Sequence, residues 1–299
     1  MKAKLKQIYE QHYKKLQIIP ILLLVFAIGQ LVLQYTSTGD LMNKGISLKG
    51  GSTITVPYHQ SIDLQGLETQ LQQEFPEADL SIRTLSAAGK TVGYTVESNV
   101  QSKEDIAAVT TILKSVLPFQ DKDFSVEVVD SSLGESFFIQ TAWALLFAFI
   151  FMGIVVFIYT RSFLPSVLLI LATVSNLVAT LAIFNLTGEK LGTGGIAAFL
   201  MLVGYSVDAE ILLASRVVKR KEGTTMDRIY SAIGTGMTMT LATLVAVTAA
   251  LIFVNNEVVH QIMLILFIGL FVDMINTWIQ NVGLLRSHLE KKKQPKHGV

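Results

Sequence analysis

Residues 18–36 read IIPILLLVFAIGQLVLQYT, and this run contains no charged side chain. As a helix it would span roughly 28 Å, close to the thickness of the hydrocarbon core of a bilayer. A cleavable signal peptide has a shorter apolar region and small residues at its cleavage site, whereas this run ends in Leu33-Gln34-Tyr35-Thr36. We therefore predict an uncleaved first transmembrane helix at residues 18–36, after a Lys-rich segment at residues 1–17.

Apolar segments also fill the second half of the chain. The composition is 51% hydrophobic and 16% charged, with a mean hydropathy of +0.51, which is rare for a soluble domain of this length. The pattern predicts a membrane α-helical protein with six transmembrane helices in the lipid bilayer. The five further helices are expected at about Phe137–Tyr159, Leu164–Leu186, Gly195–Ser215, Ile233–Val254 and Val258–Leu285, with a polar loop at Arg216–Tyr230.

Residues 37–136 have a different pattern, which alternates between the period of a strand and the period of an amphipathic helix. The order β-α-β-β-α-β predicts a ferredoxin-like α+β domain inserted between transmembrane helices 1 and 2. The expected elements are a strand at Ile46–Tyr58, a helix opened by Asp63, strands at Asp79–Ser86 and Lys90–Glu97 joined by Ala87-Ala88-Gly89, a helix at Glu104–Leu117, and a strand through Phe124, Val126 and Val128.

The distribution of Lys and Arg predicts the orientation, because short basic loops stay in the cytoplasm. One side would hold residues 1–17, Arg161, the basic Arg216–Tyr230 loop and a basic tail at residues 286–299. The other side would hold residues 37–136 and short loops that carry few cations. We therefore expect both termini in the cytoplasm and an extracytoplasmic small domain, with residues 137–285 supplying transmembrane helices 2–6.

Several classes of function lack a supporting pattern. The absence of cysteine excludes disulfides, thiol catalysis and Cys-based metal sites, and a net charge of +1 gives no indication of nucleic-acid binding. Neither a GxxxxGK[ST] phosphate loop nor a GxSxG nucleophile motif occurs. The five histidines are scattered along the chain. We therefore expect no cofactor, no metal site and no enzymatic activity.

Three carboxylates fall within the predicted transmembrane helices, where each ionisable group costs roughly 2.5–3.5 kcal/mol on insertion scales. They are Asp208 and Glu210 in helix 4 and Asp273 in helix 6. Asp208 and Asp273 would lie at similar depth, so neighbouring helices would let them share a site and one proton. Glu210 would point away from Asp208, since two residues correspond to roughly 200° of helical rotation.

A polar stripe extends this pattern on helix 6, where Asn276 and Gln280 follow Asp273 on one face, and Asn176 in helix 3 could join it. Such a stripe is either a water-lined path or a set of interhelical hydrogen bonds. For Glu210 two interpretations also remain open. It has a functional role, or it is solvated near the cytoplasmic interface or paired with a nearby cation.

Four motifs together resemble the SecD/SecF family of protein-export proteins, and its SecF members in particular. They are Gly45–Gly51 (GISLKGG), Ala182–Gly188 (AIFNLTG), Val203–Leu212 (VGYSVDAEIL) followed by Arg216, and Thr240–Leu244 (TLATL). The residues that match the family motifs are Gly50, Gly51, Gly204, Asp208 and Arg216.

The resemblance implies a fold of the resistance-nodulation-division superfamily and a role beside the Sec translocation channel. A SecD-like subunit would supply six further helices, and the pair would assist the export or release of polypeptides across the cytoplasmic membrane. Bacterial relatives use the proton gradient for this work. The implied partners are therefore a SecD-like subunit, the channel and exported polypeptides.

The sequence departs from the bacterial SecF pattern at three places. Val207-Asp208-Ala209 stands where those relatives carry Asn-Asp, Ser175-Asn176 where they often carry an acidic residue, and Thr235 where they carry arginine. These differences indicate an archaeal-type member and leave proton coupling open. The alternative function is a half-size, proton-driven transporter of a small or lipid-like solute, which would work without a second polytopic subunit.

Overall fold

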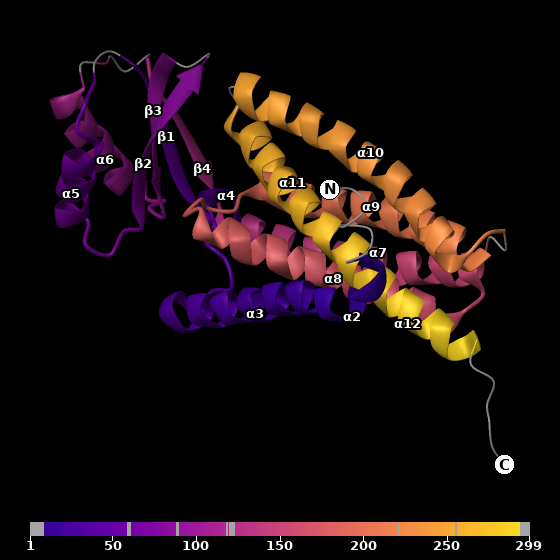
Figure 1. Cartoon of the computed structure of the whole chain (residues 1–299). Helices are drawn as coiled ribbons and strands as arrows, with labels where there is room; N and C mark the ends of the chain where they lie inside the picture. The colour runs from indigo at the N-terminus through magenta and orange to yellow at the C-terminus, as the bar shows by residue number, and fades with distance from the viewer. Residues whose placement is uncertain are drawn as a thin grey trace.

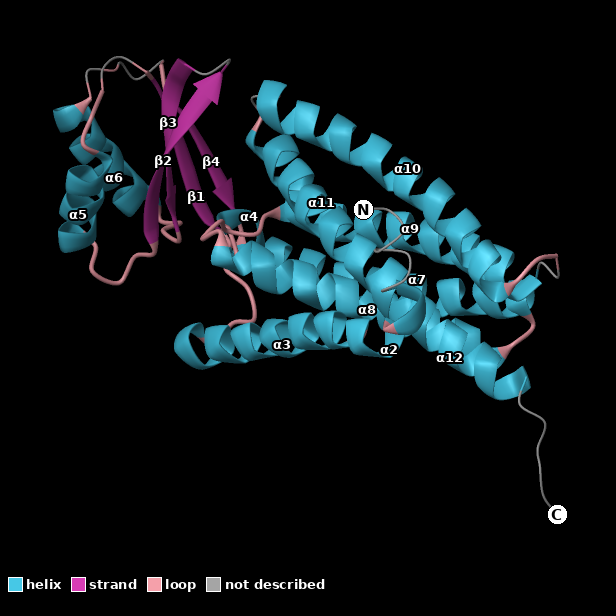
Figure 2. Ribbon diagram, viewed as in Figure 1, coloured by secondary structure: helices cyan, strands magenta, loops and turns pink. Residues whose placement is uncertain are grey.

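The computed structural model describes residues 9–58, 61–87, 90–117, 119, 123–219, 222–254 and 256–293. These residues form a bundle of long helices with a small sheet-and-helix domain at one end, which we call the small domain (Figure 1, Figure 2). The chain enters the small domain after its first long helix and then returns to the bundle.

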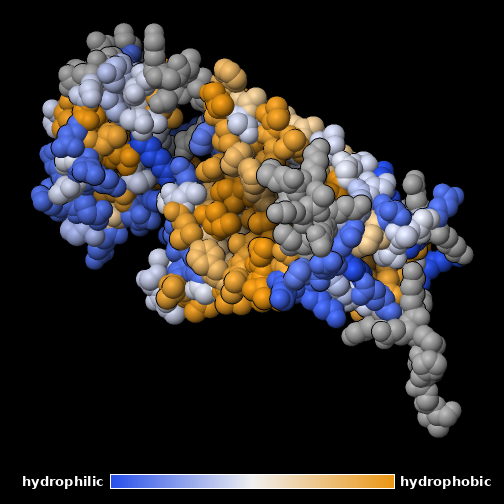
Figure 3. Space-filling model, in the orientation of Figure 1, coloured by the Kyte–Doolittle hydropathy of each residue, from blue (hydrophilic) through white to orange (hydrophobic). Residues whose placement is uncertain are grey.

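Six helices of the described chain are long and apolar enough to cross a membrane. Their exposed surface forms a broad apolar belt between the hydrophilic surfaces of the small domain and of the opposite end of the bundle (Figure 3). The elements of the bundle are α2 (Tyr13–Leu16), α3 (Ile18–Thr38), α7 (Ser131–Thr160), α8 (Phe163–Leu186), α9 (Thr193–Ala214), the π-helix η1 (Ser215–Lys219), α10 (Thr225–Phe253), α11 (Glu257–Ile275), the π-helix η2 (Asn276–Asn281) and α12 (Val282–Lys293).

The small domain has one four-stranded antiparallel sheet in the order β2-β3-β1-β4. Strand β1 is central, and its Ile54 pairs with Val96 of β3 and Val126 of β4. Strands β2 and β4 therefore form the two edges. The elements are α4 (Ile46–Lys49), β1 (Gly51–Pro57), α5 (Leu64–Glu74), β2 (Leu80–Ala87), β3 (Lys90–Ser98), α6 (Lys103–Val116) and β4 (Ser125–Val129).

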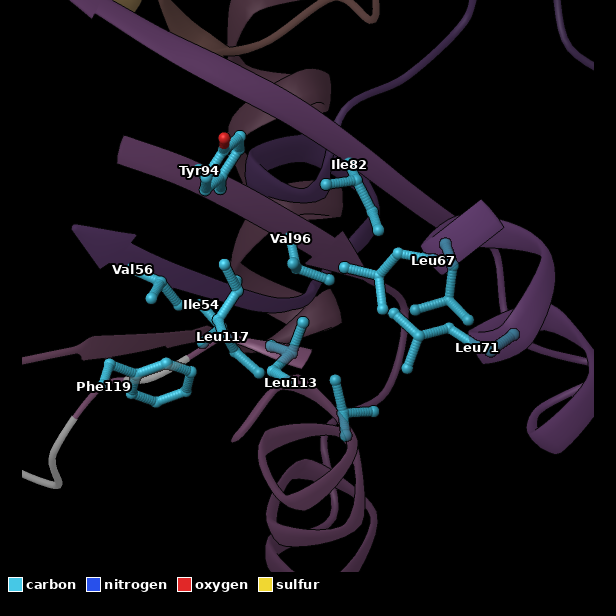
Figure 4. Close-up of a cluster of buried hydrophobic side chains, with 13 residues drawn as sticks. Ile54, Val56, Leu67, Leu71, Ile82, Tyr94, Val96, Leu113, Leu117 and Phe119 are labelled. Atoms are coloured by element: carbon cyan, nitrogen blue, oxygen red, sulfur yellow. The ribbon is translucent and has the colours of Figure 1, made fainter. Parts of the chain in front are cut away.

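Helices α5 and α6 cover one face of the sheet and enclose its core (Figure 4). Alternate residues of the strands, such as Val56 and Val96, meet Leu71 of α5 and Leu113 of α6 in one buried cluster, as the two-residue period of a strand requires. The opposite face of the sheet looks toward the bundle (Figure 1). There Asp79 lies 3.2 Å from Lys190 of the α8–α9 turn and 3.6 Å from Lys49.

The strand expected at Ile46–Tyr58 is only partly correct, because its first residues form the single helical turn α4. Gly50 and Gly51 then redirect the chain into β1 with φ values of 81° and 145°, which favour glycine. A Cβ on Gly51 would also overlap the Ser98 carbonyl of β3. The glycine pair thus permits a close approach of two backbones at the start of the sheet.

The polar loop expected at Arg216–Tyr230 is also too long. Helix α9 continues into η1, and α10 begins already at Thr225, where Thr224 and Asp227 form a reciprocal capping box. The final helix likewise runs on to Lys293 rather than ending near Leu285. The expected tail beyond Lys293, the turn residues Ala88 and Gly89, and residues 1–8 lie outside the described residues.

The π-helix η2 interrupts the last membrane helix and leaves backbone carbonyls for side chains to satisfy. The Tyr9 hydroxyl donates to the Trp278 carbonyl at 2.5 Å. The Gln17 amide nitrogen donates to the carbonyl of Ile279 at 2.5 Å and to that of Gln280 at 3.2 Å. The N-terminal segment is therefore fastened to the end of the bundle through the irregular turn.

Candidate functional site

Asp273 of α11 is the centre of a polar cluster inside the bundle. Its side chain is 2% exposed. Its Oδ1 accepts a hydrogen bond from Ser206 Oγ of α9 at 2.6 Å and another from Asn176 Nδ2 of α8 at 3.2 Å. Three helices thus meet at one carboxyl group, and residues of α8 and α9 supply the hydrogen bonds that a buried polar group requires.

Two threonines extend this cluster along α8. Thr180 donates to Asn176 Oδ1 at 3.4 Å, and the hydroxyl groups of Thr173 and Ser206 lie 3.5 Å apart. All five side chains of the cluster are buried. The arrangement is a continuous set of buried hydrogen bonds, and the bonds of such a network strengthen one another.

Glu210 forms a second polar group and is 0% exposed. Thr277 Oγ1 donates to its Oε1 at 3.3 Å, and the amide of Asn281 donates to its Oε2. The proposal that Glu210 is solvated or paired with a cation is therefore wrong, because its partners in the described chain are a hydroxyl and an amide. Both partners come from η2, whose wider turn directs them toward α9.

The expected stripe of Asp273, Asn276 and Gln280 runs from α11 into the same π-helix. Gln280 Nε2 reaches Ser175 Oγ of α8 at 3.5 Å, while its Oε1 has no partner among the described residues. The amide nitrogen of Asn276 is buried and likewise has no partner there. Asp273 and Gln280 thus both contact α8, at Asn176 and Ser175, and a single polar path along the stripe stays a prediction.

Asp208 occupies a different environment from Asp273 and Glu210. Its side chain is exposed and has no hydrogen-bonding or ion-pairing partner in the part of the chain that the structure describes. Asp208 and Asp273 nevertheless line the same cavity of about 120 Å³, between α9, α10 and α11, together with Tyr205 and Thr240. The two carboxylates therefore line one cavity, and a shared site that holds one proton stays a prediction.

Asp208 belongs to an exposed stripe along one face of α9, which we call the α9 stripe. It consists of Ala197, Met201, Gly204, Tyr205 and Asp208. The spacing of four, three, one and three residues is that of a single helical face. Gly204 has open space around it, with nothing within 4 Å of an added Cβ.

The glycines of the α8–α9 turn and of the start of α9 are packed against α11. Gln261 Oε1 of α11 accepts from the backbone nitrogens of Gly192 and Gly195 at 2.9 and 3.0 Å. Its amide nitrogen donates to the Lys190 carbonyl at 2.6 Å. Gly194 is buried against Val258.

Arg216, which follows the third of the four motifs, has a structural contact. Its Nη1 donates to the Ser231 carbonyl and to the Ser231 hydroxyl oxygen, both at 2.6 Å. It therefore ties η1 to α10.

Sequence reasoning missed the neutral partners of the carboxylates. Ser206, Thr277 and Asn281 are ordinary residues for a membrane helix, and only the packing of α9 against η2 and α11 gives them a role. A usable signal was the coincidence of several small polar residues within apolar helices. In the described residues no group of three or more His, Asp or Glu side chains could hold a metal ion.

Comparison with known proteins places this architecture in a class. The family model for "Protein export membrane protein SecD/SecF, C-terminal" matches residues 108–291. Protein-export membrane protein SecF of Pyrococcus furiosus is 35% identical over 98% of this chain and 97% of its own length. The SecF of Methanolacinia petrolearia is 34% identical over 93% of this chain and 94% of its own length.

The class is thus that of multi-pass membrane proteins of protein export. Within it, the chain belongs to the SecD/SecF family and is similar to its archaeal SecF members over nearly the full length. The names of these relatives describe protein export rather than an enzymatic reaction.

A solved structure shares the fold. The crystal structure of SecDF, a translocon-associated membrane protein from Thermus thermophilus, matches with a TM-score of 0.72 at 20% identity. The match covers 93% of this chain and 38% of that chain, so this chain spans well under half of the SecDF chain.

Proposed function

We propose that the chain is a SecF-like accessory subunit of the protein translocase, which acts with a SecD-like subunit to assist polypeptide export across the cytoplasmic membrane. Both termini lie in the cytoplasm, and the small domain is a ferredoxin-like module outside it. The sheet order β2-β3-β1-β4 with both helices on one face supports that description of the module. The cation-rich segments at the opposite end of the bundle support the orientation.

The observation that carries the proposal is the α9 stripe. An exposed carboxylate in a membrane helix would face hydrocarbon at a cost of roughly 2.5–3.5 kcal/mol on insertion scales. The exposed residues of α10 include the small Gly234, Thr238 and Ala242 beside larger ones such as Met239 and Leu241. Small residues beside a polar group are typical of a helix–helix contact in a membrane. A second membrane chain therefore covers this face.

The exposed face of α3 provides the contrast. There the exposed side chains are large and apolar, such as Leu22, Val25 and Leu33, and that face suits lipid. Two faces of one bundle thus have different chemistry, one for lipid and one for a protein partner. The SecDF match, in which this chain spans 38% of a longer chain, is consistent with a SecD-like occupant of the second face.

The proposal extends to proton coupling. A partner over the α9 stripe would enclose the cavity that Asp208 and Asp273 line. From there the hydrogen-bonded chain through Ser206 and Asn176 leads between α8, α9 and α11. Paired carboxyl groups joined to such a chain are suited to take up and release protons inside a membrane.

The experiment is affinity purification of the tagged protein from its native membrane in mild detergent. The test variant is Gly204→Leu, which places a bulky side chain on the α9 stripe. The matched control is Gly29→Leu on α3, where an added Cβ also meets nothing within 4 Å. We expect the unaltered protein and the control to recover a SecD-like chain, and the test variant to lose it.

Recovery of the unaltered protein without any second polytopic chain would contradict the proposal. If that protein alone then moved a small solute after reconstitution, the half-size transporter would be the better explanation. Equal loss of the partner in both variants would indicate general damage and argue against the α9 stripe as the contact.

A further inference from the structure

A cleft of about 340 Å³ separates the small domain from the near ends of α10 and α11. Three consecutive residues of β2, Arg83, Thr84 and Leu85, line one wall. Successive residues of a strand point to opposite faces of a sheet, so a wall made by three in a row follows the edge of the strand. Strand β2 is an edge strand in the sheet order, and the cleft borders this edge, on which the described residues place no further strand.

The opposite wall is amphipathic. Its apolar part comes from the end of α10, where Leu251, Ile252 and Val254 line the cleft and Ile252 is 67% exposed. Its polar part comes from α11, where Asn256 and His260 line it. The outward ends of the two helices and the sheet face each other in Figure 1.

Ion pairs hold the two walls in place. Arg83 lies 3.5 Å from Glu189 of the α8–α9 turn, and Asp79 lies 3.2 Å from Lys190 of the same turn. The Gln261 side chain fixes that turn to α11. The cleft is thus preformed and carries both signs of charge at its base.

We propose that this cleft binds an extended segment of the exported polypeptide, which adds as a strand to the free edge of β2. The inference rests on the proposed function and names the substrate site. An edge strand offers backbone donors and acceptors that pair with any sequence. The apolar residues of α10 accept side chains from one side of such a segment, and the mixed charges beside Arg83 favour neither acidic nor basic ones. A component of an export machinery meets many sequences, and this recognition is independent of sequence.

The length of regular edge sets the size of the segment. The pairing of β2 with β3 is regular from Leu80 to Leu85 and shifts between Leu85 and Ser86. Six residues of strand correspond to about 20 Å. A bulge limits how far pairing can spread along an edge, so the site binds only a short stretch of polypeptide. The short regular edge also limits unwanted association with other strands.

The experiment places a photo-crosslinking residue at position 84 in the full complex, in native membrane vesicles with an export substrate stalled in transit. The matched control position is Thr111, which is exposed on α6, within the helical layer that covers the other face of the sheet. We expect crosslinks to the stalled substrate from position 84 and few from position 111. Crosslinks from position 84 to the SecD-like subunit alone, or equal yields from both positions, would overturn the proposal.

A second experiment closes the cleft. The chain has no cysteine, so Thr84→Cys combined with Asn256→Cys can be bridged by a short, cleavable bifunctional thiol reagent. The control pair is Thr69→Cys with Thr111→Cys, on α5 and α6 of the small domain. We expect bridging to reduce export in the test pair only, and cleavage of the reagent to restore it.

Unchanged export after complete bridging of the test pair would overturn the cleft as a substrate site. Two other results would contradict the proposed function itself. Export would be unchanged in cells that lack this chain, or no SecD-like partner would be recovered with it. The two failures are therefore distinguishable.

Discussion

Ser206 of α9 donates a 2.6 Å hydrogen bond to Oδ1 of Asp273 in α11, across 67 positions of sequence. The bond joins two helices in the middle of an apolar bundle, where a lost partner is expensive to replace. It therefore gives one predicted carboxylate a fixed position and a measurable contribution to stability.

Replacement Ser206→Ala removes this donor and leaves Asp273 with Asn176. We expect a loss of about 1–3 kcal/mol in the free energy of unfolding, because a buried acceptor loses a partner. Thermal unfolding in detergent measures it. Ser166→Ala is the control, since among the described residues that buried serine bonds only to the Ser162 carbonyl, just before its own helix α8. Equal destabilisation by the two variants would contradict a special role of the interhelical bond.

Replacement Asp273→Asn tests whether Asp273 takes up and releases protons, and it leaves the packing of the helices unchanged. Asparagine has the shape of aspartate and can still accept from Ser206 and Asn176, so the fold should persist. If Asp273 carries protons, export of a secreted reporter in vesicles should lose its dependence on the proton gradient. Export that responds to the gradient as in the unaltered protein would restrict Asp273 to a structural role.

Replacement Glu210→Leu removes the acceptors that Thr277 and Asn281 require. Both buried donors would lose their partner, and we expect a loss of about 1–3 kcal/mol in the free energy of unfolding. Asn281→Leu in the same chain removes one of the two donors left without a partner, so the double variant should regain part of the stability. Thermal unfolding of the two variants measures the difference, and a double variant no more stable than Glu210→Leu would argue against this contact.

The contact of the small domain with the bundle should weaken in acid. Burial alone would raise the pKa of Asp79, but the ammonium groups of Lys190 and Lys49 outweigh it and hold this pKa below the ordinary 3.8. A lowered folded-state pKa means that the stabilisation is fully present above the ordinary carboxyl pKa and is lost as the pH falls through the folded-state value.

Hydrogen exchange of the α8–α9 turn as a function of pH measures this effect. Protection should decrease below about pH 4 in the unaltered protein. The Asp79→Asn variant should show lower protection at neutral pH and a smaller change on acidification. A variant with the same pH profile as the unaltered protein would show that other groups, such as Glu189, control the contact.

Much of the architecture is predictable because apolar length and strand alternation are local signals. The run at residues 18–36 lies within helix α3, and the alternation at Lys90–Glu97 is strand β3. The predicted ends of helices and strands were wrong where a helix cap or a glycine pair sets the boundary. Thr224 and Asp227 start α10 early, and Gly50 and Gly51 convert an expected strand start into a helical turn.

The polar site was harder to predict, because its partners come from packing. Asp273 and Asn176 were singled out as costly groups in a membrane, but Ser206 joins them only because α8, α9 and α11 converge. The period of an α-helix also fails at η2, where one wider turn sends Thr277 and Asn281 toward Glu210. A pattern based on 3.6 residues per turn cannot anticipate that change.

An α9 face that only another chain completes would also make an unassembled copy recognisable to the cell. Such an orphan would keep Asp208 and Gly204 uncovered in the lipid, while its folded core remained intact. Quality-control proteases that survey membranes for misplaced polar groups could then remove the surplus and hold the subunits at matched abundance. Exposure of Asp208 would thus mark an unassembled subunit, in addition to any role of this carboxylate in transport.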